Sequence, residues 1–592
     1  MTLSLATEQK LDWQDLTPTL NIQGQPGEFS DFFTLQPAAS LAIKHFLQNK
    51  HRTLLVLKAD DQTEYAKLLE KHVQSLQAPN LPISGVRYVI EQGDSFSFPS
   101  IYIEPAQSLD DNFAAQKSVA TALYFDQSQL FGTVRLHPSS QDIQLSAGLV
   151  HQLNNGVLIL SAAAFLSQLD LWQRLKQLLL SKTFSWYSLH PYKSLPCHIP
   201  DCPLSLKVIL LGNREELALL NEVDEELYHW ADYAEIESYF TLNNVQDPQL
   251  WRDYVVNLAK QAGLPNLIED GVNKLYQLLV RQSESRSLIS ISPLKLTALL
   301  ADAAAFSQDN QLSAVVFEQY FLQKYQQHGF LREQTYGEIL NEQVFVATDG
   351  EMVGQINGLS VVEYQGTPIS FGEPSRISCI VQFGDGEVVD VERKNELAGN
   401  LHSKGLMIAE SCLANILEFA SQLPFSASIV FEQSYAEIDG DSASLASFCV
   451  LTSALADLPL PQSIAVTGAI DQFGLVHSVG GVNDKIEGFF TLCERRGLTG
   501  SQGVIIPSAT IHQLSLSEAV VNAVKNHQFS IWVVEDVYQA CEILFQRHLV
   551  EEENMDYSAD NQPLSRLIQQ RIELRSEQQQ KGSWLRRMFG GR

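Results

Sequence analysis

One serine of this sequence stands where a nucleophile could be activated. The stretch EIDGDSASLASF, residues 437–448, places Ser442 after an Asp-Gly-Asp turn and directly before a run typical of a helix. Main-chain N–H groups in the first turn of such a helix can point at a developing oxyanion. Serine at a helix entrance is also a common N-cap. This stretch alone leaves both interpretations open, a nucleophile and a cap.

A serine hydroxyl needs a base to become a nucleophile, and the sequence offers a lysine for that role. Lys485 lies in HSVGGVNDKIEGFF, residues 477–490, shortly after Gly480 and Gly481. We expect it in the first turn of a helix, where the helix dipole and partial burial both favour a neutral amine. A neutral amine is what a general base requires. A solvated surface lysine is the alternative that this stretch leaves open.

Taken together, the two stretches resemble the proteolytic domain of the Lon family, serine peptidases that use a Ser-Lys dyad without histidine. The family's nucleophile lies in a DG-x-S-A motif, and its lysine follows a Gly-Gly pair; here Lys485 follows Ser442 by 43 residues. The resemblance implies that Ser442 is the nucleophile and Lys485 the base. Thr467 of VTGAI matches the family threonine whose hydroxyl helps to hold the lysine amine. A strand threonine packed among apolar neighbours is the alternative for Thr467.

The resemblance extends upstream, where the sequence is similar to the Lon B-like branch of the family. It is strong over residues 340–545, which include GQINGLSVVEY, DVERKNELAGNLHSKG and FSASIVFEQSYAEIDGDSAS. His402 in NLHSKG matches a family histidine near the substrate groove, but the dyad does not need it as a base. Members of this branch couple a AAA+ ATPase to the peptidase. Residues 129–179 and 204–220 resemble the core of that ATPase.

The phosphate-binding part of that ATPase is missing. A phosphate-binding loop needs glycines and a lysine, in the order GxxxxGK followed by Ser or Thr. Gly-Lys occurs nowhere in the 592 residues. The strand-like TLLVLK is followed by ADDQTEYAK, residues 59–67, which has no glycine and carries Asp60, Asp61 and Glu64. These carboxylates would repel a triphosphate, so we predict a degenerate Walker A motif.

The Walker B motif is altered as well. Ser161 and Ala162 stand where the Mg²⁺-holding aspartate and the water-activating glutamate are expected. Asn213 of LLGNRE survives at the sensor position, but it cannot bind nucleotide alone. ATP and Mg²⁺ are expected from the family, whereas peptide hydrolysis by a Ser-Lys dyad requires no cofactor. We therefore predict an ATPase-derived scaffold that has lost hydrolysis.

The elements that position these residues alternate between strands and helices in the first half of the chain. Runs at residues 53–58, 157–160 and 207–211 are rich in leucine or β-branched residues. Amphipathic helical stretches such as residues 165–180 separate them, which predicts a parallel sheet covered on both faces. From residue 249 to 330 the pattern is helical.

The second half has its own strand and helix signals. The stretches 343–364 and 376–393 are β-branched runs interrupted by Asp-Gly turns, which predict hairpins. Helices are expected at 404–423 and 444–458, followed by a strand at 463–470.

A last clear helix is expected to begin near Asn483 and to stop at Gly497. Four apolar residues should share its buried face: Ile486, Phe489, Phe490 and Cys493.

The predicted fold is therefore multidomain α/β plus α+β. A AAA+-like parallel-sheet domain with a degenerate nucleotide site is expected at residues 1–248, and a helical subdomain at 249–335. A Lon-type α+β proteolytic domain is expected at 336–550, and a flexible tail at 551–592.

Composition and charge exclude several classes of protein. The chain has 69 acidic and 40 basic residues, a net charge of −29, so a nucleic-acid binder is not expected. Seven irregularly spaced cysteines indicate a reducing compartment. The N-terminal stretch lacks the features of a signal peptide, and the apolar runs are too short or too charged to cross a bilayer. The sequence predicts a cytoplasmic protein.

Two smaller signals could mark other binding sites. Cys197, His198 and Cys202 offer three metal ligands, but a structural zinc site wants four and no second pair is nearby, so we predict no metal site. The C-terminal WLRRMFGGR, residues 584–592, is basic and aromatic. It could contact a membrane surface or a partner, and a frayed tail is the alternative.

The combined prediction is a Lon B-like serine endopeptidase with an inactive ATPase half. By resemblance it is a homo-oligomer, a hexameric ring, that cleaves unfolded or extended polypeptides, because a chamber without ATP-driven unfolding admits little else. Two alternatives remain open. One is an ATP-dependent Lon protease with an unrecognised nucleotide site, and the other is a chaperone-like or adaptor ring whose dyad is never aligned.

Overall fold

The computed structural model groups the chain into two compact units. It describes residues 9–22, 30–60, 62–77, 83–92, 99–137, 142–188, 192–364, 366–419, 423–434, 439–551, 557–558 and 561–575. The larger unit comprises Met1–Asn21, Leu267–Ile289 and Ala303–Arg592. The smaller unit comprises Ile22–Asn266 and Ser290–Asp302. The chain therefore crosses from one unit to the other four times, and the segment predicted as a helical subdomain contributes to both.

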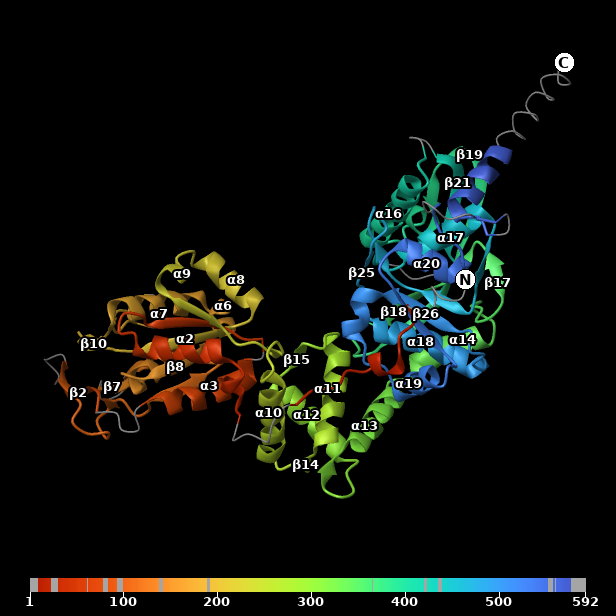
Figure 1. The fold of residues 1–592 in the computed structure, drawn as a ribbon. Coiled ribbons are helices and arrows are strands. Elements are labelled where there is room, and N and C mark those ends of the chain that lie inside the picture. Colours follow the sequence, from red (N-terminus) through yellow and green to blue (C-terminus); the bar gives the residue numbers. More distant parts are fainter. Residues whose placement is uncertain are drawn as a thin grey trace, which may run out of the picture. The chain divides into compact units, whose positions relative to one another are not determined.

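The smaller unit is built on a five-stranded parallel sheet (Figure 1). Its strand order is β12–β1–β11–β8–β5, and every neighbouring pair is parallel. The strands are β1 (Leu54–Lys58), β5 (Val119–Ala122), β8 (Val157–Ser161), β11 (Lys207–Gly212) and β12 (Asp232–Glu235). The three predicted runs are the adjacent strands β1, β11 and β8. The predicted parallel sheet is confirmed, and β1 and β8 are buried along their whole length, as expected of strands covered on both faces.

Helices cover this sheet (Figure 1). They are α2 (Pro37–Gln48), α3 (Gln62–Leu76), α6 (Ala162–Leu166), α7 (Leu169–Ser181) and α8 (Arg214–Val223). The single helix predicted at 165–180 is wrong, because α6 ends and α7 begins within it. Gln168, the N-cap of α7, leaves the helical conformation, and Asp170 then lies in the first turn, where the helix dipole favours an acidic residue.

The larger unit contains a mixed seven-stranded sheet in the order β20–β21–β19–β18–β23–β26–β27. Its long antiparallel part joins β18 (Gln355–Glu363), β19 (Ser370–Gly386) and β21 (Leu423–Phe431). The parallel part joins β18, β23 (Ile464–Val466), β26 (Gly503–Pro507) and β27 (Ser530–Val534). This unit confirms the predicted α+β class.

Both predicted Asp-Gly hairpins are wrong. β17 (Glu351–Val353) pairs with β22 (Pro459–Pro461), while residues 343–348, which are all described, form no strand. β19 runs through the second turn, and β20 (Val388–Asp390) pairs in parallel with β21, which lies between β20 and β19. An Asp-Gly pair specifies a bend, whereas the partner of each strand is chosen by the apolar face that it buries.

Helices α16 (Asn400–Ile416), α17 (Ser444–Ala456), α18 (Val482–Arg496) and α20 (Val537–Phe545) pack on this sheet (Figure 1). The prediction for α18 is confirmed: Gly497 is its C-cap, and its four predicted core residues are buried. It is not the last helix, however, because α19 (Glu518–Lys525) and α20 follow it. These helices have only 8 and 9 residues, so each offers about two turns of pattern in the sequence.

Part of the predicted flexible tail is packed. Residues 564–575 are helical, and Leu564 and Ile568 are fully buried in the core beneath α17 and α20. Arg571 donates hydrogen bonds to the carbonyls of Ala454 and Leu455 at the end of α17. This correction follows from apolar residues spaced four apart, which fit one face of a helix.

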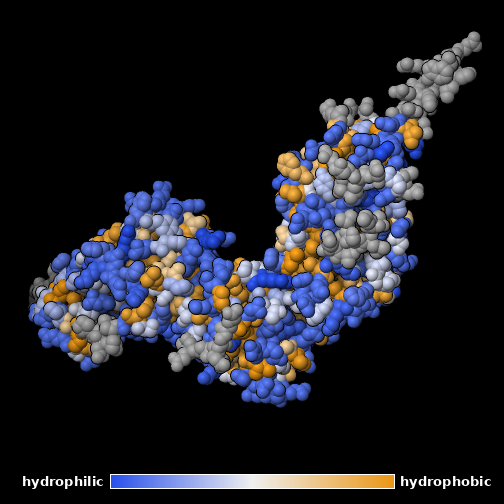
Figure 2. All heavy atoms as spheres, viewed as in Figure 1, coloured by the Kyte–Doolittle hydropathy of each residue, from blue (hydrophilic) through white to orange (hydrophobic). Residues whose placement is uncertain are grey.

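The described part of the chain contains no helix that is both long and apolar enough to span a bilayer. On the face drawn in Figure 2, hydrophilic residues predominate and hydrophobic residues are interspersed among them.

Candidate active site

Ser442 lies in the turn that leads into α17. The N-cap of this helix is Ala443, and no side chain caps it. Ser444 Oγ instead braces the turn, because it donates to the carbonyl of Asp441 at 2.8 Å and accepts the N–H of Ile470 at 2.9 Å. The hydroxyl of Ser442 therefore does not serve as the cap of α17.

The three residues singled out for chemistry meet in the structure. Lys485 Nζ lies 3.0 Å from Ser442 Oγ and 3.4 Å from Thr467 Oγ1. Thr467 Oγ1 also donates to the main-chain carbonyl of Ser442 at 3.4 Å. Only 4% of Lys485 and none of Thr467 is exposed. Lys485 is thus not a solvated surface residue, and its amine points at the serine hydroxyl.

The environment of Lys485 favours a neutral amine. Burial lowers the pKa of Lys485 from 10.5 to about 8, while the carboxylates of Glu284 and Asp441 act in the opposite direction. The residue also lies in the first turn of α18, where the positive end of the helix dipole disfavours an ammonium group. A lysine with this pKa can accept a proton near neutral pH, which is the property that a general base needs.

The position of α18 is set by close contacts at glycine residues. Its N-cap, Gly481, is left-handed with a φ of 68°, and a Cβ there would overlap the side chain of Val361. A Cβ at Gly372 of β19 would overlap the carbonyl of Asp484, and one at Gly488 of α18 would overlap the carbonyl of Gly372. The helix that carries Lys485 therefore rests directly on a strand, with two glycines in the contact.

His402 lies on α16. It is buried, and its Nε2 is 3.8 Å from Asp390 Oδ2. Burial lowers the pKa of His402, and Asp390 opposes that shift. Asp390 also accepts the N–H of Arg393, and the neighbouring Glu392 accepts the N–H of Phe431. This cluster therefore ties α15 (Val391–Lys394) and α16 to β21.

Asp60 and Asn213, which lie in the stretches compared with nucleotide-binding motifs, contact protein groups. Lys58, at the end of β1, is buried and forms ion pairs with Asp60 at 3.3 Å and Glu237 at 3.0 Å. Helix α3 begins shortly afterwards, and Asp61 lies outside the described residues. Asn213 caps α8, since its Oδ1 accepts the N–H of Glu216 at 2.9 Å.

The remaining sequence signals do not form sites in the described part of the chain. Ser161 is the last residue of β8, and Ala162 begins α6. Cys197, His198 and Cys202 do not converge as a group of three metal ligands. The basic aromatic stretch 584–592 lies outside the described residues.

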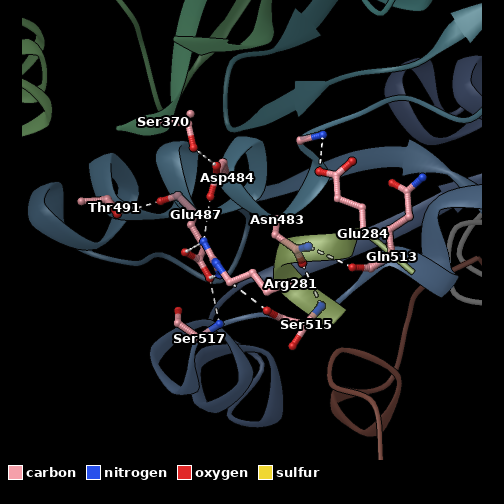
Figure 3. Close-up of polar contacts among 12 residues, drawn as sticks. Arg281, Glu284, Ser370, Asn483, Asp484, Glu487, Thr491, Gln513, Ser515 and Ser517 are labelled. Carbon is pink, nitrogen blue, oxygen red and sulfur yellow. Dashed lines mark hydrogen bonds and ion pairs between the residues drawn. The ribbon is translucent and has the colours of Figure 1, made fainter. Parts of the chain in front are cut away.

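Two residues near the dyad were not singled out from the sequence. Arg281 and Glu284 come from α11 (Glu269–Ser283) and the residue after it, and both contact the beginning of α18 (Figure 3). Their separation from Lys485 along the chain is about 200 residues, and no motif or spacing in the sequence signals a contact over that distance.

Comparisons with known proteins cover both units. Residues 116–231 match the family described as LonB-like, AAA domain, and residues 431–547 match the Lon protease (S16) C-terminal proteolytic domain. A Lon protease homologue of Haemophilus influenzae is 63% identical over 579 residues, which is 98% of this chain and 96% of that protein. A Lon protease homologue of Escherichia coli is 40% identical over 583 residues, 97% of each chain. An archaeal Lon protease of Methanocaldococcus jannaschii is 34% identical over 185 residues, 30% of this chain and 26% of that protein.

Proposed function

Because the chain belongs to the Lon protease family, in its Lon B-like branch, we propose that it is a serine endopeptidase in which Ser442 and Lys485 form the catalytic dyad. The observation that carries this proposal is the 3.0 Å separation of Lys485 Nζ from Ser442 Oγ. The burial that lowers the pKa of Lys485 to about 8 supports the role of base.

In the proposed mechanism, neutral Lys485 accepts the proton of Ser442 while Oγ attacks the carbonyl carbon of a peptide bond. Main-chain donors at the start of α17 stabilise the negative oxygen of the tetrahedral intermediate. The resulting ammonium group of Lys485 protonates the leaving amine as the C–N bond breaks. Water, deprotonated by the same lysine, then hydrolyses the acyl ester and restores Ser442. Thr467 orients the amine throughout.

We further propose that peptide hydrolysis does not depend on ATP hydrolysis by this chain and requires no cofactor. The absence of Gly-Lys from the sequence supports this proposal, as do the ion pairs that occupy Lys58. The segment that matches the AAA family begins at residue 116, after β1 and residues 59–67. The part of an ATPase that binds phosphates therefore lies outside the match.

The proposed substrates and assembly rest on membership of the Lon family and on the proposed lack of ATP-driven unfolding. We propose that unfolded or extended polypeptides are cleaved inside a homo-oligomeric, hexameric ring in the cytoplasm. The net charge of −29 makes a nucleic-acid partner unsuitable.

The test is cleavage of unfolded, fluorescently labelled casein by the wild type, Ser442→Ala and Lys485→Met, each with and without Mg-ATP. We expect both variants to lose about 10³-fold or more in rate, and ATP to have no effect. Ser411→Ala is the matched control, because that hydroxyl donates to the Met407 carbonyl of its own helix.

Each other outcome contradicts a specific part of the proposal. Full activity of Ser442→Ala would exclude the dyad, and cleavage that requires ATP would exclude the inactive ATPase. If the wild type cleaves nothing and a fluorophosphonate probe does not label Ser442, the binding ring with an unaligned dyad replaces the peptidase.

A further inference from the structure

Helix α11 contributes two charged side chains to the N-terminal end of α18, the helix of Lys485 (Figure 3). The two helices are distant in sequence, since 197 residues separate Glu284 from Gly481. Both belong to the larger unit. The contact is made where the catalytic amine is presented, in the first two turns of α18.

Arg281 joins two carboxylates that flank Lys485 on α18. Its guanidinium donates to both oxygens of Glu487, at 2.6 and 2.8 Å, and to Asp484 Oδ1 at 2.7 Å. Ser370 Oγ of β19 donates to the other oxygen of Asp484 at 3.1 Å. The Arg281 side chain is only 16% exposed, and a bidentate pair at this burial is stronger and better oriented than a surface ion pair.

Glu284 holds the N-cap residue of α18. The N-cap, Gly481, has no side chain, so its own turn offers no capping oxygen. Glu284 Oε1 accepts the N–H of Gly481 at 2.6 Å. Glu284 is itself left-handed, with a φ of 52°, which is uncommon for a residue other than glycine. The backbone at the end of α11 is therefore shaped to deliver a carboxylate to the start of α18.

A neighbouring loop completes the enclosure of the same turns. Asn483 Oδ1 accepts the N–H of Ser515 at 2.8 Å, and its amide donates to the carbonyl of Gln513 at 2.9 Å. The N–H of Ser517 donates to Glu487 Oε1 at 2.8 Å. Arg281 supplies a positive charge to this network. It pairs with Asp484, which β19 also contacts, and with Glu487, which the loop also contacts.

We propose that Arg281 and Glu284 are positioning residues for Lys485, and that together they hold the start of α18 so that the amine meets Ser442. Arg281 fixes the orientation of the turn that carries Lys485. Glu284 fixes where the helix begins and places one negative charge near the amine. This inference rests on the proposed role of Lys485 as the base.

The sign of the electrostatic effect follows from the charges around Lys485. Glu284 and Asp441 favour its ammonium form, whereas burial disfavours it. Asp484 and Glu487 would add to the effect of Glu284 if Arg281 did not neutralise them. Other titratable groups lie on the strands β18 and β19, on the 3-10 helix Ser508–Gln513 and on α14 (Phe330–Leu340): Glu363, Glu373, Arg376, His512, Arg332, Glu333, Tyr336 and Glu338.

The decisive variant is Glu284→Gln, which keeps a carbonyl oxygen to accept the N–H of Gly481 but removes the charge. The readout is the pH dependence of the rate at which a fluorophosphonate probe phosphonylates Ser442, with loss of fluoride. We expect the midpoint of the pH profile to fall by about one unit, so that labelling at pH 7 becomes several-fold faster. A purely structural role of Glu284 would not move this midpoint, and an unchanged midpoint would overturn the electrostatic part of the proposal.

Arg281→Gln tests the proposed role of Arg281, which is to fix the orientation of the turn that carries Lys485. We expect labelling at pH 7 to slow by about tenfold or more, because the turn loses its anchor, and the midpoint to rise, because two carboxylates lose their counter-ion. Arg281→Lys should recover part of the rate. Lys274→Met is the matched control, since it removes an equally shielded ion pair of α11 that joins Glu318 and Glu518 and leaves α18 untouched. An Arg281→Gln variant no slower than this control would overturn the proposal.

Hydrogen exchange separates failure of this inference from failure of the proposed function. Mass spectrometry of residues 481–490 does not need catalysis, so it applies even if the wild type neither cleaves casein nor reacts with the probe. We expect faster exchange there in Arg281→Gln and wild-type exchange in Glu284→Gln and Lys274→Met. Equal exchange in all four proteins would show that α18 is held without Arg281.

Discussion

Lys485 lies in an environment that is unfavourable for its charged form. Lys485 is 4% exposed, and the Ser442 and Thr467 hydroxyls lie within 3.4 Å of its amine. Burial lowers its pKa to about 8, so near neutral pH the folded protein still carries a poorly solvated ammonium group most of the time. The property that would make Lys485 a base therefore destabilises the fold.

Lys485→Met should make the protein more stable as well as inactive. The folded pKa of about 8 lies below the ordinary value of 10.5, so the unfolded chain binds the proton more tightly. We expect the free energy of unfolding at pH 7 to rise by about 2 kcal/mol in this variant. The gain should be complete below pH 8 and vanish as the pH approaches 10.5. Denaturant titration at several pH values measures it, and a variant less stable than wild type at pH 7 would contradict the argument.

Ser442, Lys485 and Thr467 could be singled out from the sequence because each lies in a short stretch that resembles a motif of the Lon family. The contacts among them agree with that expectation. Arg281 and Glu284 could not be found in this way. A charged residue on an amphipathic helix is typical of a solvated face, and only the packing of α11 against α18 distinguishes these two from other surface charges.

Helix α18 and strand β19 fit together because neither carries a Cβ where they touch. The close approach of Gly372 and Gly488 brings the main chain of the helix against the strand and determines the distance of Lys485 from the rest of the site. Contacts of this kind tolerate little added volume, since the obstructing atoms belong to the main chain and cannot rotate away.

Gly488→Ala should therefore push α18 away from β19. We expect a loss of about 2 kcal/mol in the free energy of unfolding and slower labelling of Ser442. Gly337→Ala is the matched control, because it lies inside α14 with no atom within 4 Å of the added methyl group. There the change should stabilise the protein by about 1 kcal/mol. Thermal denaturation of both variants, together with their labelling rates, provides the comparison.

Strands were predicted well where they are fully buried. They were predicted poorly where the pairing of two strands was inferred from a local turn signal. The continuous apolar runs of β1, β8 and β11 predict a parallel sheet because such strands are buried on both faces. The Asp-Gly pairs do not predict strand partners, since β19 runs through the second pair and β21 takes the place beside β19 that a hairpin would have given to β20.

At the scale of the whole molecule, the smaller unit has the parallel sheet of a AAA-type domain. Asn213 caps a helix, and Lys58 is paired with carboxylates. The strands of this sheet are packed in an apolar core, so we expect the fold to form without a bound nucleotide.

Mg-ATP should leave the melting temperature unchanged. A ligand present at one hundred times its Kd adds about 2.7 kcal/mol to the stability of the state that binds it, which a thermal melt resolves easily. The measurement is a pair of melts with and without millimolar Mg-ATP, with Mg-ADP as a second ligand. A clear rise in the melting temperature with either nucleotide would mean that an unrecognised site exists.

Because the chain crosses four times between its two units, no short gene segment encodes the whole larger unit. The larger unit needs residues 9–16, whose Lys10 pairs with Trp532 at the edge of the sheet and whose Leu16 is fully buried. It also needs α11, which lies between two stretches of the smaller unit. A gene segment for residues 336–550 would transplant the serine and the lysine without the charges that hold them in register. A contiguous gene segment that encodes the complete larger unit therefore also encodes the smaller unit.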